Sequence, residues 1–143
     1  MVRAKSNPAS RDEYLTAINS ENFKHKLFYA KYVNTGTGAY EHLTVLAIAQ
    51  AVNLYRKRNS IDNDYKLSVV IDGLKRSEEA RIGKQLREVG VASKKVRGAR
   101  DESEPLIRLA DRIAGLIRDA DAGGKAYQAV RRELEHQGII NKL

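Results

Sequence analysis

The sequence predicts an α/β protein with a small, three-stranded sheet and flanking helices. Segments with helical spacing of apolar residues alternate along the chain with short segments of β-branched residues. The segment KLSVVIDGL at 66–74 is a β-branched run that ends in Asp-Gly, which is typical of a buried parallel strand. No linker rich in Pro or Gly interrupts the chain, so we expect residues 1–143 to form a single domain.

The amino-terminal third predicts a helix, a strand and a long helix. Ser10 and Glu13 have the spacing of a capping box and predict a helix over 10–22. KLFYAKYV at 26–33 is rich in β-formers, and the TGTG that follows breaks it. The helix expected at 39–58 is apolar on most sides and ends in Arg-Lys-Arg, which suits the negative end of a helix dipole.

The rest of the chain continues the alternation after the strand at 66–74. A helix at 76–89 is ended by Gly90, and SKKVRG at 93–98 is a short basic strand. The helix at 103–120 has Pro in its first turn. The apolar arc of this helix is centred on Leu106, Leu109, Ala110, Ile113, Leu116 and Ile117. A last helix covers 124–137, and the tail GIINKL either docks or frays.

Composition limits the function classes. The chain has 26 Lys and Arg against 18 Asp and Glu, a net charge of +8 that favours polyanions as partners. A basic domain with its charges spread over every helix is an equally good reading, because no basic run is long. Cys is absent, and no apolar run approaches the ~20 residues that cross a bilayer, so we expect a cytoplasmic protein without a membrane partner. TGTGAYEH lacks the Lys-Ser/Thr pair of a phosphate-binding loop, and the three His show no metal spacing.

Three carboxylates are candidates for chemistry. Asp72 follows an apolar strand, and ligands gather at the carboxyl ends of strands in open α/β sheets. The alternative is that Asp72 makes an Asp-Gly turn and caps the next helix. Asp111 lies at the border of an apolar arc with Gly115 one turn on, which leaves open space beside it. The alternative is a surface Asp paired with Arg108 or Arg118.

The third carboxylate, Glu41, aligns with the buried stripe of its helix but also lies in the first turn, where the dipole favours an acid anyway. Carboxylates that meet at one end of a sheet would bind Mg²⁺ or Mn²⁺, and such ions support phosphodiester cleavage. A basic surface would hold the nucleic-acid backbone. The basic residues expected to do so are Lys94, Lys95, Arg97, Arg100, Arg108 and Arg112.

Two segments carry a resemblance to a known family. VVIDG (69–73) and VRGARDESEPLIRLADRIAGLI (96–117) together resemble the carboxyl half of the bacterial domain-of-unknown-function family thirty-eight hundred. Its hallmark is a hydrophobic strand ending in Asp, then Ser, then a helix reading Leu-Ala-Asp-x-x-Ala-Gly. Here these are Asp72, Ser103 and the residues from Leu109 to Gly115. RDEYLTAI and KLFYAKYV also look like the family's middle.

The resemblance implies a ribonuclease-H-like fold and, by analogy with that fold, a divalent-metal-dependent nuclease activity. Asp72 matches the acid of the fourth strand, Asp111 that of a late helix and Glu41 that of the long helix, so the resemblance implies a metal held by Asp72 and Asp111. Family members begin with a strand carrying Asp-Glu-Ser-Gly, and nothing like it precedes Val2. We therefore expect a domain without its first strands, an incomplete site, and a homodimer that covers the incomplete sheet.

Three hypotheses about function follow. The first is a nuclease-like, metal-dependent domain acting on nucleic acid, which requires Asp72 and Asp111 within reach of one ion. The second is a non-catalytic module that binds nucleic acid or protein, which requires basic residues on one face. The third is a self-associating fragment without activity of its own.

Overall fold

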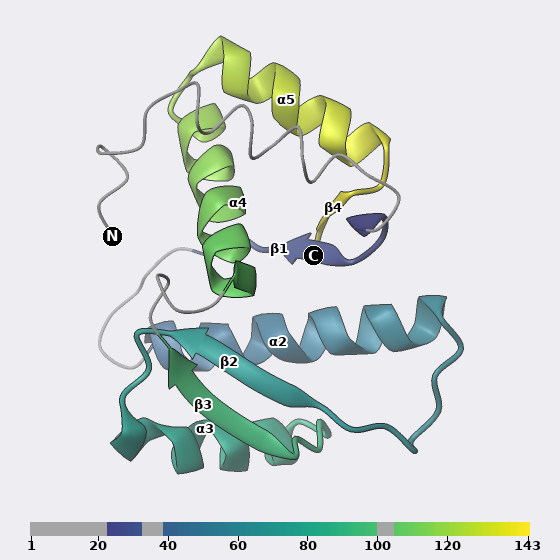
Figure 1. The fold of residues 1–143 in the computed structure, drawn as a ribbon, viewed down its shortest axis with the longest axis vertical. Coiled ribbons are helices and arrows are strands. Elements are labelled where there is room, and N and C mark those ends of the chain that lie inside the picture. Colours follow the sequence, from purple (N-terminus) through teal and green to yellow (C-terminus); the bar gives the residue numbers. More distant parts are fainter. Residues whose placement is uncertain (1–22, 33–38, 100–104) are drawn as a thin grey trace. The chain divides into compact units, whose positions relative to one another are not determined.

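The structure, a computed structural model, describes residues 23–32, 39–99 and 105–143. Four helices and four strands lie in these residues, so the predicted mixed α/β class is confirmed (Figure 1). Their order is β1 (Leu27–Tyr29), α2 (Ala39–Arg58), β2 (Ser68–Asp72), α3 (Arg76–Glu88), β3 (Lys95–Ala99), α4 (Pro105–Asp121), α5 (Lys125–His136) and β4 (Ile140–Lys142). None of these helices is long and apolar enough to cross a membrane.

The chain divides into two compact units. Unit 1 contains the described residues up to Tyr29 and those from Leu109 to Lys142, and unit 2 contains those from Ala30 to Arg108. Each unit has its own two-stranded sheet and its own cluster of buried residues.

Unit 2 is built on a strand–helix–strand arrangement. β2 and β3 pair in parallel, with Val69 opposite Val96, and α3 makes the crossover between them (Figure 1). Val69, Ile71 and Val96 point to one face and pack against α2 and α3. The core members from the helices are Val45 and Ala49 of α2 with Ile82 and Leu86 of α3. Ser68, Val70 and Asp72 alternate with this set and therefore lie on the other face.

The turn between β2 and α3 lies very close to the backbone of β3. A Cβ added at Gly98 would lie 2.0 Å from the carbonyl oxygen of Leu74, so only Gly fits under this turn. The backbone N–H of Gly98 donates to Oε2 of Glu79 on α3, 2.9 Å away. The turn between β2 and α3 is thereby held against β3 by both a steric fit and a hydrogen bond.

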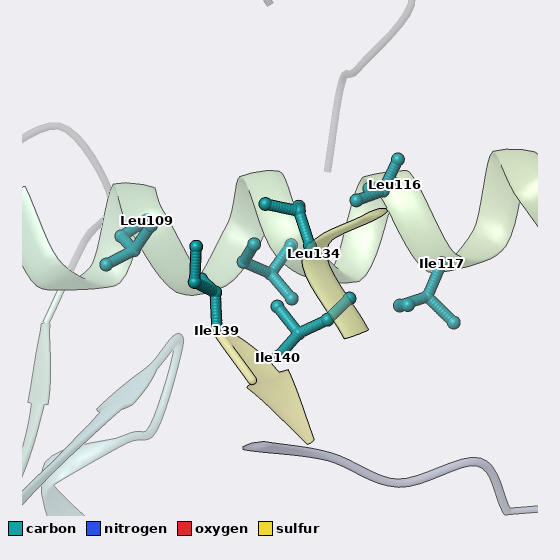
Figure 2. Packing of buried hydrophobic residues seen from close by; sticks show 7 residues of the cluster. Leu109, Leu116, Ile117, Leu134, Ile139 and Ile140 are labelled. Carbon is teal, nitrogen blue, oxygen red and sulfur yellow. The ribbon is translucent and has the colours of Figure 1, made fainter. Parts of the chain in front are cut away.

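Unit 1 closes one sheet between the two ends of the described chain. β1 and β4 pair in parallel, with Leu27 opposite Ile140, and α4 and α5 supply most of the core. Figure 2 shows Leu134, Ile139 and Ile140 gathered against the α4 residues Leu109, Leu116 and Ile117. Leu116 and Ile140 are almost wholly excluded from solvent. The burial of these apolar side chains holds the two short strands in place.

The elements differ from the prediction mainly in the sheet. The prediction of one three-stranded sheet is wrong for the described residues, which form two sheets of two strands. The strand expected at 26–33 is shorter, Leu27–Tyr29, and the tail docks as the unpredicted strand β4. β4 escaped prediction because three residues, INK, are too short to show periodicity. The helix predicted at 10–22 lies outside the described residues.

Burial along α4 also differs in part from the predicted apolar arc. Leu109, Ile113, Leu116 and Ile117 are buried as expected, but Leu106 is 72% exposed and Ala110 is also exposed. Ile107, which lies outside the predicted arc, is buried. The spacing of apolar residues therefore predicts burial correctly in the later turns of α4 but not in its first turn.

Candidate functional site

A small pocket lies at the carboxyl end of β2, where the sequence places its first candidate. Its volume is about 80 Å³. The lining residues come from the first turns of α2, the end of β2 and the start of α3: Tyr40, Glu41, Thr44, Ile71, Asp72, Gly73, Leu74, Glu78 and Ile82. In parallel α/β arrangements this edge is where ligands bind. The pocket therefore brings Asp72 and Glu41, two of the three predicted carboxylates, into one place.

Asp72 is exposed at the last position of β2. The turn after it uses the left-handed backbone of Gly73, with φ 74°, and the N–H of Gly73 donates to the carbonyl of Ala99 at 3.0 Å. The expected Asp-Gly turn is therefore present. The alternative that Asp72 caps the next helix is wrong, because the capping position of α3 is Lys75.

Glu41 is tied to a cation from α3. Nε of Arg81 donates to Oε1 of Glu41 at 2.7 Å, and Arg81 also lies 3.5 Å from Glu78. The hydrogen bond from Arg81 lowers the pKa of Glu41 below its ordinary value, and a weaker contribution comes from Gln85. Partial burial acts in the opposite direction. Glu41 is thus an ionised carboxylate at neutral pH with one oxygen already engaged.

Arg81, which contacts the pocket residues Glu41 and Glu78, was not predicted from the sequence. The signal was present, because Arg81 follows Glu78 at helical spacing and so shares its side of α3. The contact with Glu41 joins two helices and has no local signature. Glu78 itself accepts the backbone N–H of Lys75 at 3.0 Å, which gives it a structural role at the start of α3.

The carboxylates of the pocket do not form a ready metal site. Among residues 23–32, 39–99 and 105–143, no group of three or more His, Cys, Asp or Glu is arranged to hold an ion. Glu41 accepts a hydrogen bond from Arg81, and Glu78 accepts one from the backbone at the start of α3. With these two carboxylates engaged, the pocket does not fit a divalent ion without rearrangement.

Asp111, the candidate on α4, belongs to the other unit. It is half-buried, beside the buried stripe of Leu109 and Ile113, and Gly115 one turn on is buried. Its position at the border of the apolar arc agrees with the sequence. Asp72 and Glu41 lie in unit 2, so the prediction that Asp72 and Asp111 share one ion stays a prediction. Ser103 of the family hallmark lies outside the described residues.

Five of the six predicted basic residues lie in the part of the chain that the structure describes, three in or just before β3 and two on α4. Lys95 and Arg97 alternate along β3 and lie on the sheet face opposite α2 and α3, where their register partners are Ser68 and Val70. Lys94 precedes the strand, and its N–H donates to the carbonyl of Leu67 at 2.7 Å.

The remaining members of the predicted basic set lie beyond β3. Arg108 and Arg112 are one helical turn apart on α4, the first exposed and the second half-buried. Arg100 lies outside the described residues. The structure therefore gathers two of the six predicted cations on one strand face.

A second polar cluster, in unit 1, was not expected from the sequence. Tyr29 of β1 donates its hydroxyl to Oε1 of Glu135 at 2.8 Å, and Arg131 reaches both Glu135 at 3.7 Å and Asp121 at 2.8 Å. Burial, followed by the interaction with Glu135, raises the pKa of Tyr29 to about 12. The cluster joins β1, α5 and the end of α4, which is a structural role.

Comparison with known proteins gives no relative for this chain. No family model matches it, and neither the curated proteins nor the solved structures contain a significant match. The class that the fold defines is a mixed α/β protein with two small parallel sheets.

Proposed function

We propose that this protein is a nucleic-acid-binding module that contacts the phosphate backbone. The observation that carries the proposal is the placement of Lys95 and Arg97 on the face of the β2–β3 sheet opposite α2 and α3. Lys95 is exposed and Arg97 half-buried. A strand presents alternate side chains on one face at a spacing of about 6.6 Å, which lets neighbouring cations meet successive backbone groups.

Charge supports the same reading. The net charge of +8 gives long-range attraction to any polyanion, and Lys or Arg contacts to phosphates are independent of sequence. Such binding does not need a metal ion. This agrees with a pocket in which Arg81 binds Glu41 and the backbone at the start of α3 binds Glu78.

The binding experiment is fluorescence anisotropy with labelled single-stranded and duplex DNA and RNA of one sequence, with chelator present. The test variant is Lys95→Gln with Arg97→Gln. The matched control is Lys84→Gln with Arg132→Gln, which removes the same charge from exposed positions on α3 and α5. We expect the test variant to weaken binding and to reduce the salt slope by about one for each cation that no longer meets a phosphate.

The control variant should keep most of the affinity and the wild-type slope. Equal reductions of affinity in both variants would mean that only total charge matters, and the strand face would have no special part. Absence of binding by the wild-type protein at low salt would refute the proposal.

A second candidate is metal-dependent phosphodiester chemistry on a ribonuclease-H-like fold of family thirty-eight hundred. It is favoured by one observation, the shared pocket of Asp72 and Glu41 at the carboxyl end of β2. This candidate requires Mg²⁺ or Mn²⁺ to be bound by both Asp72 and Asp111, and it requires Arg81 to release Glu41 so that Glu41 can support the site.

Calorimetric titration of Mn²⁺ tests this candidate. Asp72→Asn and Asp111→Asn should each abolish heat of binding, while Asp64→Asn, an exposed control outside the pocket, should not. No heat with the wild-type protein, or heat that survives Asp72→Asn, would remove the nuclease hypothesis for this chain.

A further inference from the structure

The two edges of the β2–β3 sheet are not equivalent. On the β3 side, the backbone N–H of Gly98 is already taken by Glu79. On the β2 side, no strand of the described residues pairs with Ser68–Asp72. An open strand edge is a template for another strand, and a two-stranded sheet gains stability when strands are added.

Hydrogen bonds to β3 show which residues of β2 point outward. The carbonyl of Leu67 accepts from Lys94, and the N–H of Gly73 donates to Ala99, so odd-numbered residues direct their backbone groups toward β3. Backbone direction alternates along a strand. Ser68, Val70 and Asp72 therefore direct their N–H and C=O groups to the open edge.

We propose that this edge is an interface between two copies of the chain, in which β2 pairs antiparallel with β2 of the second copy. A two-fold axis between the Val70 residues of the two copies places Ser68 of each copy opposite Asp72 of the other. Each pair then joins a hydroxyl donor to a carboxylate. On the other face Val69 lies opposite Ile71 of the second copy, which pairs β-branched residues.

The strand is self-complementary in this register. Its two polar residues, Ser68 and Asp72, are equidistant from the centre, and no like charges face each other across the axis. The three residues between them are all β-branched. The product is a continuous sheet in the order β3–β2–β2–β3, and at each outer edge the N–H of Gly98 is already bound by Glu79. This interface does not depend on the proposed function.

Substitutions at position 68 test the interface, because the dimer and the single chain respond with opposite sign. Within one chain, the register neighbour of Ser68 is Lys95. Ser68→Asp therefore adds an attractive pair to the single chain but places two carboxylates opposite each other twice in the dimer. Ser68→Lys does the reverse.

Sedimentation equilibrium measures the dissociation constant of the dimer. Thermal unfolding in dilute solution measures the stability of the single chain. We expect Ser68→Asp to raise the dissociation constant by roughly 2-fold to 30-fold, since two cross-strand pairs change at once. Ser68→Lys should lower it. Ser68→Asn, a neutral isostere of Asp, should stay close to the wild type. The swap Ser68→Asp with Asp72→Ser should restore wild-type dimerisation.

A wild-type protein that stays monomeric at the highest attainable concentration would overturn the proposal. Equal shifts from Ser68→Asp and Ser68→Lys, or failure of the swap to restore the dimer, would also overturn it, because the register predicts opposite effects and a rescue.

Discussion

The backbone N–H of Gly98 and the carboxylate of Glu79 lie 2.9 Å apart, and this hydrogen bond connects the last strand of the β2–α3–β3 arrangement to its crossover helix. It is partly buried and charge-assisted, which places it among the stronger bonds that a side chain makes to backbone. We expect Glu79→Ala to lower the free energy of unfolding by about 1–3 kcal/mol, because the N–H is left unsatisfied.

Urea unfolding checks that value, with Glu88→Ala as the control on the same helix. Glu88 is exposed, so its removal should change stability by less than about 0.5 kcal/mol. Equal effects of the two variants would mean that the hydrogen bond to Gly98 contributes nothing.

Gly98 and Gly83 should respond to alanine in opposite directions. At Gly98 the new Cβ would collide with the Leu74 carbonyl oxygen, so Gly98→Ala should destabilise unit 2 by about 3 kcal/mol. At Gly83, inside α3, the nearest atoms lie at 3.6 Å and 3.8 Å, which is ordinary van der Waals distance. Gly83→Ala should raise stability by about 0.5–1 kcal/mol through helix propensity.

The same urea experiment compares the two variants at one pH. Destabilisation by Gly83→Ala would show that α3 has less free space beside Gly83 than these distances indicate. An unchanged stability of Gly98→Ala would show that the turn at Leu74 can move to accommodate a methyl group.

The Glu41–Arg81 pair should make stability depend on acid. Arg81 lowers the pKa of Glu41 in the folded protein, so the pair contributes stability above the ordinary Glu value of 4.5. That contribution disappears as pH falls through the lower folded pKa. We expect Arg81→Met to reduce stability at neutral pH and to flatten the acid limb of the stability profile.

Urea midpoints measured from neutral pH down to the acid transition check this prediction. Arg87→Met, an exposed position on the same helix, is the control. An acid limb that is unchanged by Arg81→Met would mean that Glu41 does not rely on Arg81.

The phenol of Tyr29 should ionise at a higher pH than that of an ordinary tyrosine. Its pKa is raised to about 12 by burial and by Glu135, so the phenol stabilises the fold below the ordinary value of 10.0. This stability disappears as pH rises through about 12. We expect Glu135→Gln to move the late tyrosine of an ultraviolet titration toward lower pH, while Glu133→Gln leaves it in place. The opposite order would contradict the assignment to Tyr29.

Long and strongly patterned elements were predictable. The helix at 39–58 was expected with the bounds that the structure gives it, and Asp72 was expected at the end of its strand and occupies that position. In both cases the signal is local: an apolar run, a basic last turn, or an Asp-Gly turn whose Gly adopts positive φ.

Contacts between distant segments were not predictable. Arg81 reaches Glu41 across 40 positions, and Asn141 of β4 donates to Leu27 of β1 across 114. No single-sequence pattern encodes such pairs. The exposure of Leu106 and the burial of Ile107 in the first turn of α4 likewise do not follow from the spacing of apolar residues.

The pairing of β1 with β4 has a consequence for the order in which the protein assembles. β2, α3 and β3 are neighbours in sequence, so the strand–helix–strand of unit 2 closes only short loops and can form while synthesis continues. β1 precedes these elements in the sequence, yet its partner β4 follows all of them. The sheet of unit 1 therefore cannot close until Ile140 has been synthesised, and Leu27 lacks its strand partner until then.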